Sequence, residues 1–110
     1  MFCRKSLFNK TTITLDSDTI YYVNEWANVY AYAWKNDGGA GNQNDAWPGV
    51  LMTKTGYTYN GHDVYIYSIK GTSYTKIIFT NNKGSQIADL FIPSDANCYY
   101  NDSFDYVFVK

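Results

Sequence analysis

Short runs of β-branched and aromatic residues, separated by Asn, Asp, Gly and Ser, recur along the whole chain. This pattern is typical of β-strands joined by turns. No segment carries the sustained 3.6-residue apolar period of an amphipathic helix. The pattern predicts seven strands and is compatible with a short extra strand near residues 57–59. The predicted strands are Thr12–Leu15, Thr19–Asn24, Asn28–Trp34, Val64–Ile69, Lys76–Asn81, Ile87–Ile92 and Asp105–Val109.

Seven or eight short strands in a chain of 110 residues, with neither repeat nor linker, predict an all-β fold. We expect an immunoglobulin-like antiparallel β-sandwich, with a small barrel as the alternative. The length fits a single domain, residues 1–110. Residues 1–10 lack the long apolar stretch of a signal peptide and are expected to be a loosely ordered end, or part of a piece of a longer protein. Cys3 and Cys98 could form a disulfide if the first and last strands pair; two unbonded thiols are the alternative.

The predicted strand that ends at residue 34 alternates between small and aromatic side chains. One face carries Val29, Ala31 and Ala33, and the other carries Tyr30, Tyr32 and Trp34. If the small residues face the core, the rings lie outside, about 7 Å apart, as a platform for an extended ligand. If the rings face the core, the strand is structural, because large aromatic side chains usually carry core burial. The alternation alone leaves both interpretations open.

A polar segment rich in Gly and Asn follows this strand, over residues 35–46, and ends at Trp47-Pro48-Gly49. Its composition predicts a flexible loop with little to pack against. Loops on a rigid scaffold often carry function, so Trp47 is a candidate binding residue. The alternative is that Trp47 folds back over one edge of the core.

Aromatic residues make up 19% of the chain and charged residues 17%, with a formal net charge of −1. This balance argues against disorder, because disordered chains are poor in aromatics and rich in charge. No run approaches the ~18–20 apolar residues of a membrane span. A nearly neutral chain also lacks the clustered Lys and Arg of a phosphate-binding surface. The 12 tyrosines exceed what so small a core can bury.

Catalytic patterns are missing. Glu25 is the only glutamate and His62 the only histidine, and the aspartates lie mostly in predicted turns. A glycosidase needs a pair of facing carboxylates, and neither zinc spacing, an EF-hand pattern nor a phosphate-binding glycine loop is present. The sequence therefore predicts a protein that is not an enzyme and holds neither a metal nor a cofactor.

Three classes of non-catalytic protein remain. The first binds sugars, whose apolar C–H faces lie on Trp or Tyr while polar side chains bond the hydroxyls. The second binds single-stranded nucleic acid, which needs a positive groove beside the aromatics; this chain has one arginine, so nucleic acid is not expected. The third is a structural or adhesive sandwich whose rings only pack. The charge balance and the abundance of Asn and Gln around the loop favour sugar.

Several blocks in a fixed order carry a family resemblance. They are Asn28–Trp34, Ala46–Thr53, Gly61–Tyr67, Ile77–Asn82 and Gln86–Leu90. Across roughly residues 19–93 this order resembles a family 26 carbohydrate-binding module, one of the starch-binding modules attached to bacterial amylases and related proteins. The resemblance implies a β-sandwich whose strand tyrosines face outward.

The resemblance also implies a site and a role. A shallow platform would consist of Tyr30, Tyr32 and Trp47, with Lys35 and Gln86 as partners for sugar hydroxyls. The expected ligand is α-1,4-linked glucan: starch, amylose or maltooligosaccharides. The module would act as a monomer within a larger multi-domain amylase or starch-binding protein, extracellular or on the surface of a bacterial cell, without nucleic-acid or membrane partners. The loop containing Gly38, Gly39 and Gly41 looks longer than is usual in the family.

Overall fold

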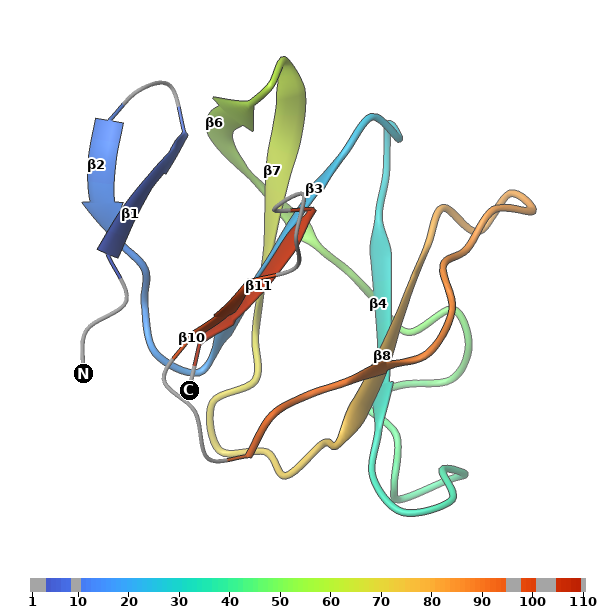
Figure 1. Ribbon diagram of the computed structural model, residues 1–110. Coiled ribbons are helices and arrows are strands. Elements are labelled where there is room, and N and C mark those ends of the chain that lie inside the picture. The colour runs from blue at the N-terminus through green and yellow to red at the C-terminus, as the bar shows by residue number, and fades with distance from the viewer. Residues whose placement is uncertain (1–3, 9–10, 95–97, 101–104, 110) are drawn as a thin grey trace. The chain divides into compact units, whose positions relative to one another are not determined.

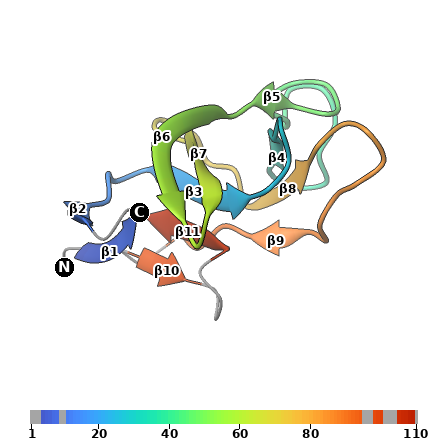
Figure 2. The same cartoon turned by 90° about the horizontal axis from the view of Figure 1, so that it is seen from above.

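The computed structural model describes residues 4–8, 11–94, 98–100 and 105–109, and within these ranges it contains strands and turns but no α-helix. The expected all-β fold is therefore confirmed. The strands, labelled in Figure 1 and, for β5 and β9, in Figure 2, are β1 Arg4–Phe8, β2 Thr11–Thr14, β3 Thr19–Asn24, β4 Tyr30–Trp34, β5 Val50–Leu51, β6 Thr53–Tyr59, β7 His62–Ser68, β8 Lys76–Thr80, β9 Leu90–Phe91, β10 Cys98–Tyr100 and β11 Tyr106–Val109.

The strands form antiparallel sheets that divide between two compact units. A five-stranded sheet, in the order β10-β11-β3-β7-β6, and the β1-β2 pair belong to residues 1–25, 53–70 and 93–110. A four-stranded sheet, in the order β5-β4-β8-β9, belongs to residues 26–52 and 71–92 (Figure 2). Two antiparallel sheets are consistent with the predicted β-sandwich. The immunoglobulin-like arrangement stays a prediction.

The predicted strand boundaries differ from the observed ones in physically understandable ways. The segment Ile87–Ile92 was too long a prediction, because only Leu90–Phe91 pair with β8. The short extra strand considered near residues 57–59 is the end of the longer β6, Thr53–Tyr59. Its pairing with β7 shifts between Lys54 and Thr58, where Gly56 has φ +88°, as expected for a bulge. The two-residue strand β5 is too short to show a period.

The first unit has its own apolar cluster, composed of Leu15, Tyr21, Val64, Val107 and Val109. Strand β7 lies between β3 and β6 and is therefore interior to its sheet. The neighbouring Tyr22 is also buried, and burial raises the pKa of its phenol to about 12 despite the hydrogen bond that its oxygen accepts from Asn24 Nδ2 at 3.0 Å. Part of the tyrosine surplus is therefore buried in the interior.

In the four-stranded sheet, the small-residue face of β4 is the buried one. Ala31 and Ala33 are fully buried, as are Ile77 and Phe79 on β8. Tyr30, Tyr32, Trp34 and Ile78, at the alternate positions, keep part of their surface accessible. This orientation is the one that the family resemblance implies, and it leaves an aromatic surface on the other face of the sheet.

Two terminal features bear on earlier expectations. Within residues 1–10, Arg4–Phe8 forms β1 and pairs with β2. Cys3 lies outside the described residues, so the disulfide with Cys98 stays a prediction. The described part of the chain contains no helix long and apolar enough to cross a membrane.

Candidate functional site

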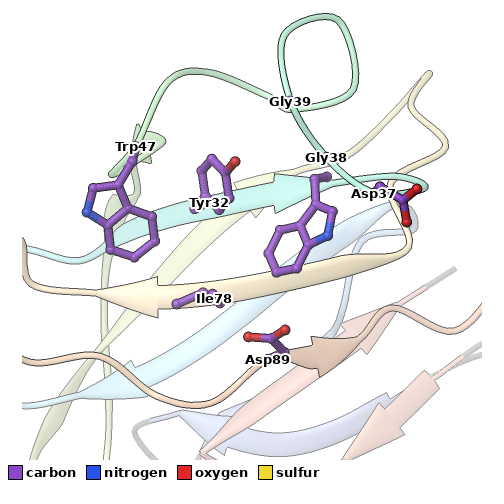
Figure 3. Close-up of a pocket in the computed structure, with 8 residues that line it drawn as sticks. Tyr32, Asp37, Gly38, Gly39, Trp47, Ile78 and Asp89 are labelled. Atoms are coloured by element: carbon purple, nitrogen blue, oxygen red, sulfur yellow. The ribbon is translucent and has the colours of Figure 1, made fainter.

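A shallow hollow of about 330 Å³ lies on the accessible face of the four-stranded sheet (Figure 3). Strand β4 and the loop after it supply most of the lining, and β8 and the segment before β9 supply the rest. The lining residues are Tyr32, Trp34, Asp37, Gly38, Gly39, Trp47, Ile78 and Asp89. All of them belong to the unit formed by residues 26–52 and 71–92.

Three aromatic rings meet in this hollow, with Tyr32 at the centre. The centroid of the Tyr32 ring lies 5.3 Å from that of Trp34, with 34° between the planes. It lies 5.3 Å from that of Trp47, with 66° between the planes. Trp47 retains 47% of its surface exposed. The aromatic surface is therefore bent, and its most exposed ring stands at an angle to the centre.

The Tyr32 ring is held by its own hydroxyl, which donates a hydrogen bond of 2.7 Å to Gln43 Oε1. Gln43 in turn lies across an isolated bridge from Trp34. A tyrosine fixed at both ends of its side chain presents its ring in one orientation, which reduces the rotamer entropy lost when a ligand stacks on it.

The loop after β4 is held by hydrogen bonds along the edge of that strand, unlike the flexible segment that its composition predicted. Beyond the short strand β5, the Asn44 side chain takes the place of a partner strand. Its Nδ2 donates to the Ala31 carbonyl at 2.8 Å, and its Oδ1 accepts from the Ala33 amide at 3.1 Å. The backbone of Asn44 donates to the Ala33 carbonyl at 2.8 Å, and the Lys35 amide donates to the Asn42 carbonyl at 2.9 Å.

Gly49 places Trp47 against the sheet. Its φ is +92°, and a Cβ at this position would collide with the Ala31 carbonyl oxygen and come within 2.7 Å of Tyr32 Cα. Its amide donates to the Ala46 carbonyl at 2.8 Å, which closes the turn around Trp47 and Pro48. Only glycine combines this left-handed backbone with so close an approach to another strand. The loop can therefore press Trp47 against Tyr32.

Two carboxylates, Asp37 and Asp89, complete the lining, and sequence reasoning did not select either for this site. In Figure 3 the Asp89 carboxylate lies across Ile78 from the Tyr32 ring, and Asp37 lies at the far end from Trp47. Carboxylate oxygens accept hydrogen bonds from hydroxyls. The place of Asp89 just before β9 depends on the register of β8 with β9, in which Ile77 faces Leu90. No local sequence pattern shows that register.

The other predicted site residues lie around the hollow. Tyr30 shares the accessible face of β4 with Tyr32 and pairs with Leu51 on one side and Thr80 on the other. Gln86 is exposed and faces Thr80 across an isolated bridge. Because Thr80 pairs with Tyr30, Gln86 lies near the end of β4 that carries Tyr30. Lys35 is half-buried at the start of the loop. The structure thus brings Tyr32 and Trp47 into contact, while Tyr30, Lys35 and Gln86 do not line the hollow. Trp34, left out of the predicted site, does line it.

A family comparison agrees with this geometry. The family model described as Starch-binding module 26 matches residues 20–92, about two thirds of the chain. The chain belongs to this family. The matched range includes β4, Trp47 and the whole lining of the hollow. Membership of this family makes the chain a non-catalytic module and implies a starch-type carbohydrate as its ligand, as the resemblance does. A search of curated proteins and a search of solved structures each returned no significant match.

Proposed function

We propose that this starch-binding module binds α-1,4-linked glucan by stacking sugar rings on Tyr32 and Trp47. The observation that carries the proposal is the contact between these two rings, 5.3 Å apart and inclined by 66°, in an accessible hollow. Two inclined rings suit a ligand whose successive sugar faces turn relative to one another. An α-1,4-linked glucan turns in this way, whereas a flat β-1,4-linked chain does not.

The stacking energy comes from apolar contact without loss of hydroxyl hydration. The C–H face of a glucose ring covers the indole or phenol ring, and its hydroxyls point outward to water or protein. Each such contact is worth on the order of 1–3 kcal/mol, as for other aromatic stacking. After the cost of association, two or three contacts correspond to a dissociation constant of roughly 10 µM to 1 mM.

Polar groups at the rim would orient the sugar. Asp37 and Asp89 line the hollow and are placed to accept hydrogen bonds from hydroxyls beside the stacked rings. We keep Tyr30, Lys35 and Gln86 in the proposed site as flanking contacts. Tyr30 is two residues from Tyr32 on the same face of β4, about 7 Å along the strand. A glucan longer than the hollow would meet it next.

A weak single site is useful when it is tethered, because it raises the local concentration of substrate near a catalytic domain. We therefore propose that the module is a monomeric part of a larger bacterial amylase or starch-binding protein, extracellular or on the cell surface, that it targets to starch. The alternative is a structural or adhesive sandwich without a sugar ligand. The ring contact and the bent shape of the hollow favour the binding function.

Isothermal titration with maltoheptaose tests the proposal. We expect binding by the unmodified chain and at least about a tenfold loss on Trp47→Ala, which removes one stacked ring. Tyr57→Ala is the matched control: Tyr57 is an aromatic of β6 that is 40% exposed and lies outside the hollow. Cellohexaose serves as the ligand control and should not bind.

Retention on insoluble starch but not on cellulose would support the same conclusion at the level of the polymer. Failure of the unmodified chain to bind both maltoheptaose and starch would favour the structural alternative. Equal binding by the unmodified chain and the Trp47→Ala variant would refute the site assignment while leaving starch binding intact.

A further inference from the structure

Phe91 is a large aromatic side chain with 74% of its surface exposed, more than Trp47, and the hollow does not include it. It lies on the two-residue strand β9, at the opposite edge of the four-stranded sheet from β5. An exposed ring of this size has little role in the core. Its position relative to the hollow suggests what it could bind.

Strand register connects Phe91 to the hollow. Trp34 on β4 faces Lys76 on β8, and Lys76 faces Phe91 on β9. Directly opposed residues of antiparallel strands point to the same face of a sheet. The Lys76 ammonium lies 5.1 Å from the centroid of the Phe91 ring, in agreement with this register. Since Trp34 lines the hollow, the row Trp34, Lys76 and Phe91 leads directly out of it.

The row gives the spacing between the two aromatic residues. Neighbouring strands lie about 4.8 Å apart, so Phe91 and Trp34, two strands apart, are separated by about 10 Å at the backbone. That span is too long for one sugar ring and suits an oligosaccharide of several units. A chain stacked on Trp47 and Tyr32 can cross the sheet along this row.

We propose that Phe91 and Lys76 form a second contact for the same glucan, reached only by longer oligosaccharides. The proposal rests on the proposed α-glucan function. Phe91 would take the apolar face of a sugar, and the Lys76 ammonium would donate hydrogen bonds to its hydroxyls. Trp34 is the stacking residue between the two contacts.

The chemistry around Phe91 favours a sugar over an apolar protein surface. Among the described residues, the ion pair that the structure shows joins Lys54 to Asp63. No carboxylate of these residues pairs with the Lys76 ammonium. Covering it with an apolar partner would bury an unpaired charge, which is costly. Sugar hydroxyls satisfy the ammonium while the ring C–H groups cover Phe91. The carboxylate of Asp89, two residues before Phe91, adds another polar group at the hollow.

Titration with oligosaccharides of two lengths tests the proposal. For Phe91→Ala we expect maltotriose affinity within about twofold of the unmodified chain and maltoheptaose affinity weaker by about tenfold, the value of one lost stacking contact. Phe91→Trp should retain or strengthen maltoheptaose binding, because it keeps an aromatic face. Lys76→Met, which keeps the length of the side chain without its charge, should weaken the longer ligand selectively.

Three outcomes discriminate the explanations. The second contact would be overturned if Phe91→Ala weakened the affinity for maltotriose and maltoheptaose equally, or changed neither. Loss of a dimer on Phe91→Ala in analytical ultracentrifugation would also overturn it, since Phe91 would then be covered by a second copy. Failure of the unmodified chain to bind either oligosaccharide would refute the proposed function itself. Tyr57→Ala is again the control, with unchanged affinity for both ligands.

Discussion

Gly49 shows how one residue without a side chain can decide the position of a large one. The residue follows Trp47-Pro48 and combines a φ of +92° with direct packing on the backbone of Ala31 and Tyr32. Because that approach is blocked by any Cβ, the distance between the loop and β4 depends on glycine here. The position of the Trp47 ring on Tyr32 follows from that distance.

We therefore predict that Gly49→Ala weakens maltoheptaose binding by at least about tenfold, because displacement of the loop moves a stacking ring out of place. It should also lower the free energy of unfolding by about 2 kcal/mol or more, from the clash and the left-handed backbone. Isothermal titration and urea denaturation measure the two effects. Gly41→Ala is the matched control, since Gly41 has φ +88° but a Cβ there would meet nothing within 4 Å.

Gly41→Ala carries the backbone cost alone, about 1–2 kcal/mol, and should leave affinity nearly unchanged. If the two variants lost affinity equally, the close packing of Gly49 on β4 would have no part in placing Trp47.

Residues of the candidate site could be predicted only where a short stretch of sequence indicates their role. Tyr32 followed from the alternation in β4, once the family resemblance had chosen which face is outward. The resemblance also chose Trp47, whose place at the end of a polar loop had left its role open. Trp34 shares the face of Tyr32 but was omitted, because its place at the strand end left open whether it is buried. The position of Asp89 in the hollow depends on the register between β8 and β9, which no local sequence pattern shows.

Strand β4 is the element on which the site is built, and its two edges are satisfied in different ways. Strand β8 pairs with one edge along the whole of β4. On the other edge, β5 pairs only with Tyr30 and Ala31, and the Asn44 side chain bonds the next two backbone groups. Hydrogen bonds of the Asn44 side-chain amide thereby hold in place a loop with few apolar residues.

Removal of the Asn44 amide should loosen this element. We predict that Asn44→Ala lowers the free energy of unfolding by about 1–3 kcal/mol, because the Ala31 carbonyl and the Ala33 amide lose partners. Maltoheptaose affinity should fall as well, since Gln43 next to it holds the Tyr32 hydroxyl. Urea denaturation and titration measure these effects.

Asn42→Ala is the control, because the Asn42 side chain bonds the Gly38 carbonyl, within the loop, at 3.2 Å. It should cost less stability than Asn44→Ala. A smaller loss for Asn44→Ala than for Asn42→Ala would contradict the role of Asn44 as a partner for β4.

At the level of elements, strands with clear alternation or β-branched residues were predictable. Strand β3 has the predicted bounds, and β4 and β8 differ from the prediction only at their ends. The prediction of a long strand over Ile87–Ile92 was wrong, because Asp89 interrupts the apolar residues there and only two positions pair with β8. The hydrogen bonds of residues 35–46 were not predictable from composition, because they depend on which backbone groups β5 leaves unpaired.

For the whole molecule, composition indicated the class of ligand better than its location. A net charge of −1 excluded a phosphate-binding surface and fits a neutral polysaccharide. The aromatic surplus divides between buried residues such as Tyr22 and Tyr65 and the accessible rings of the hollow. Which tyrosine belongs to which group depends on the faces of the strands, and the period of two cannot say which face is covered.

The buried tyrosines predict how the stability of the module depends on pH. Burial raises the pKa of Tyr22 from 10.0 to about 12 and raises the pKa values of Tyr21 and Tyr65 in the same direction. Between pH 10 and 12 the unfolded chain loses the Tyr22 proton while the folded chain keeps it, so the free energy of unfolding falls as the pH rises. Below pH 10 this contribution is fully present. The total for Tyr22 is about 3 kcal/mol.

Urea denaturation at intervals from pH 8 to 12 measures this dependence, with Tyr22→Phe as the comparison. The variant removes the ionisable hydroxyl, so its stability should fall less steeply above pH 10. Parallel curves for the two proteins would show that Tyr22 does not contribute to the alkaline loss.

The bonds that Asn44 makes along β4 also affect how the module behaves among copies of itself. An open strand edge is a template on which another chain can add a strand. Here the Ala31 carbonyl and both backbone groups of Ala33 are already bonded within the chain. Another chain therefore finds these three backbone groups of β4 already occupied and cannot add a strand through them.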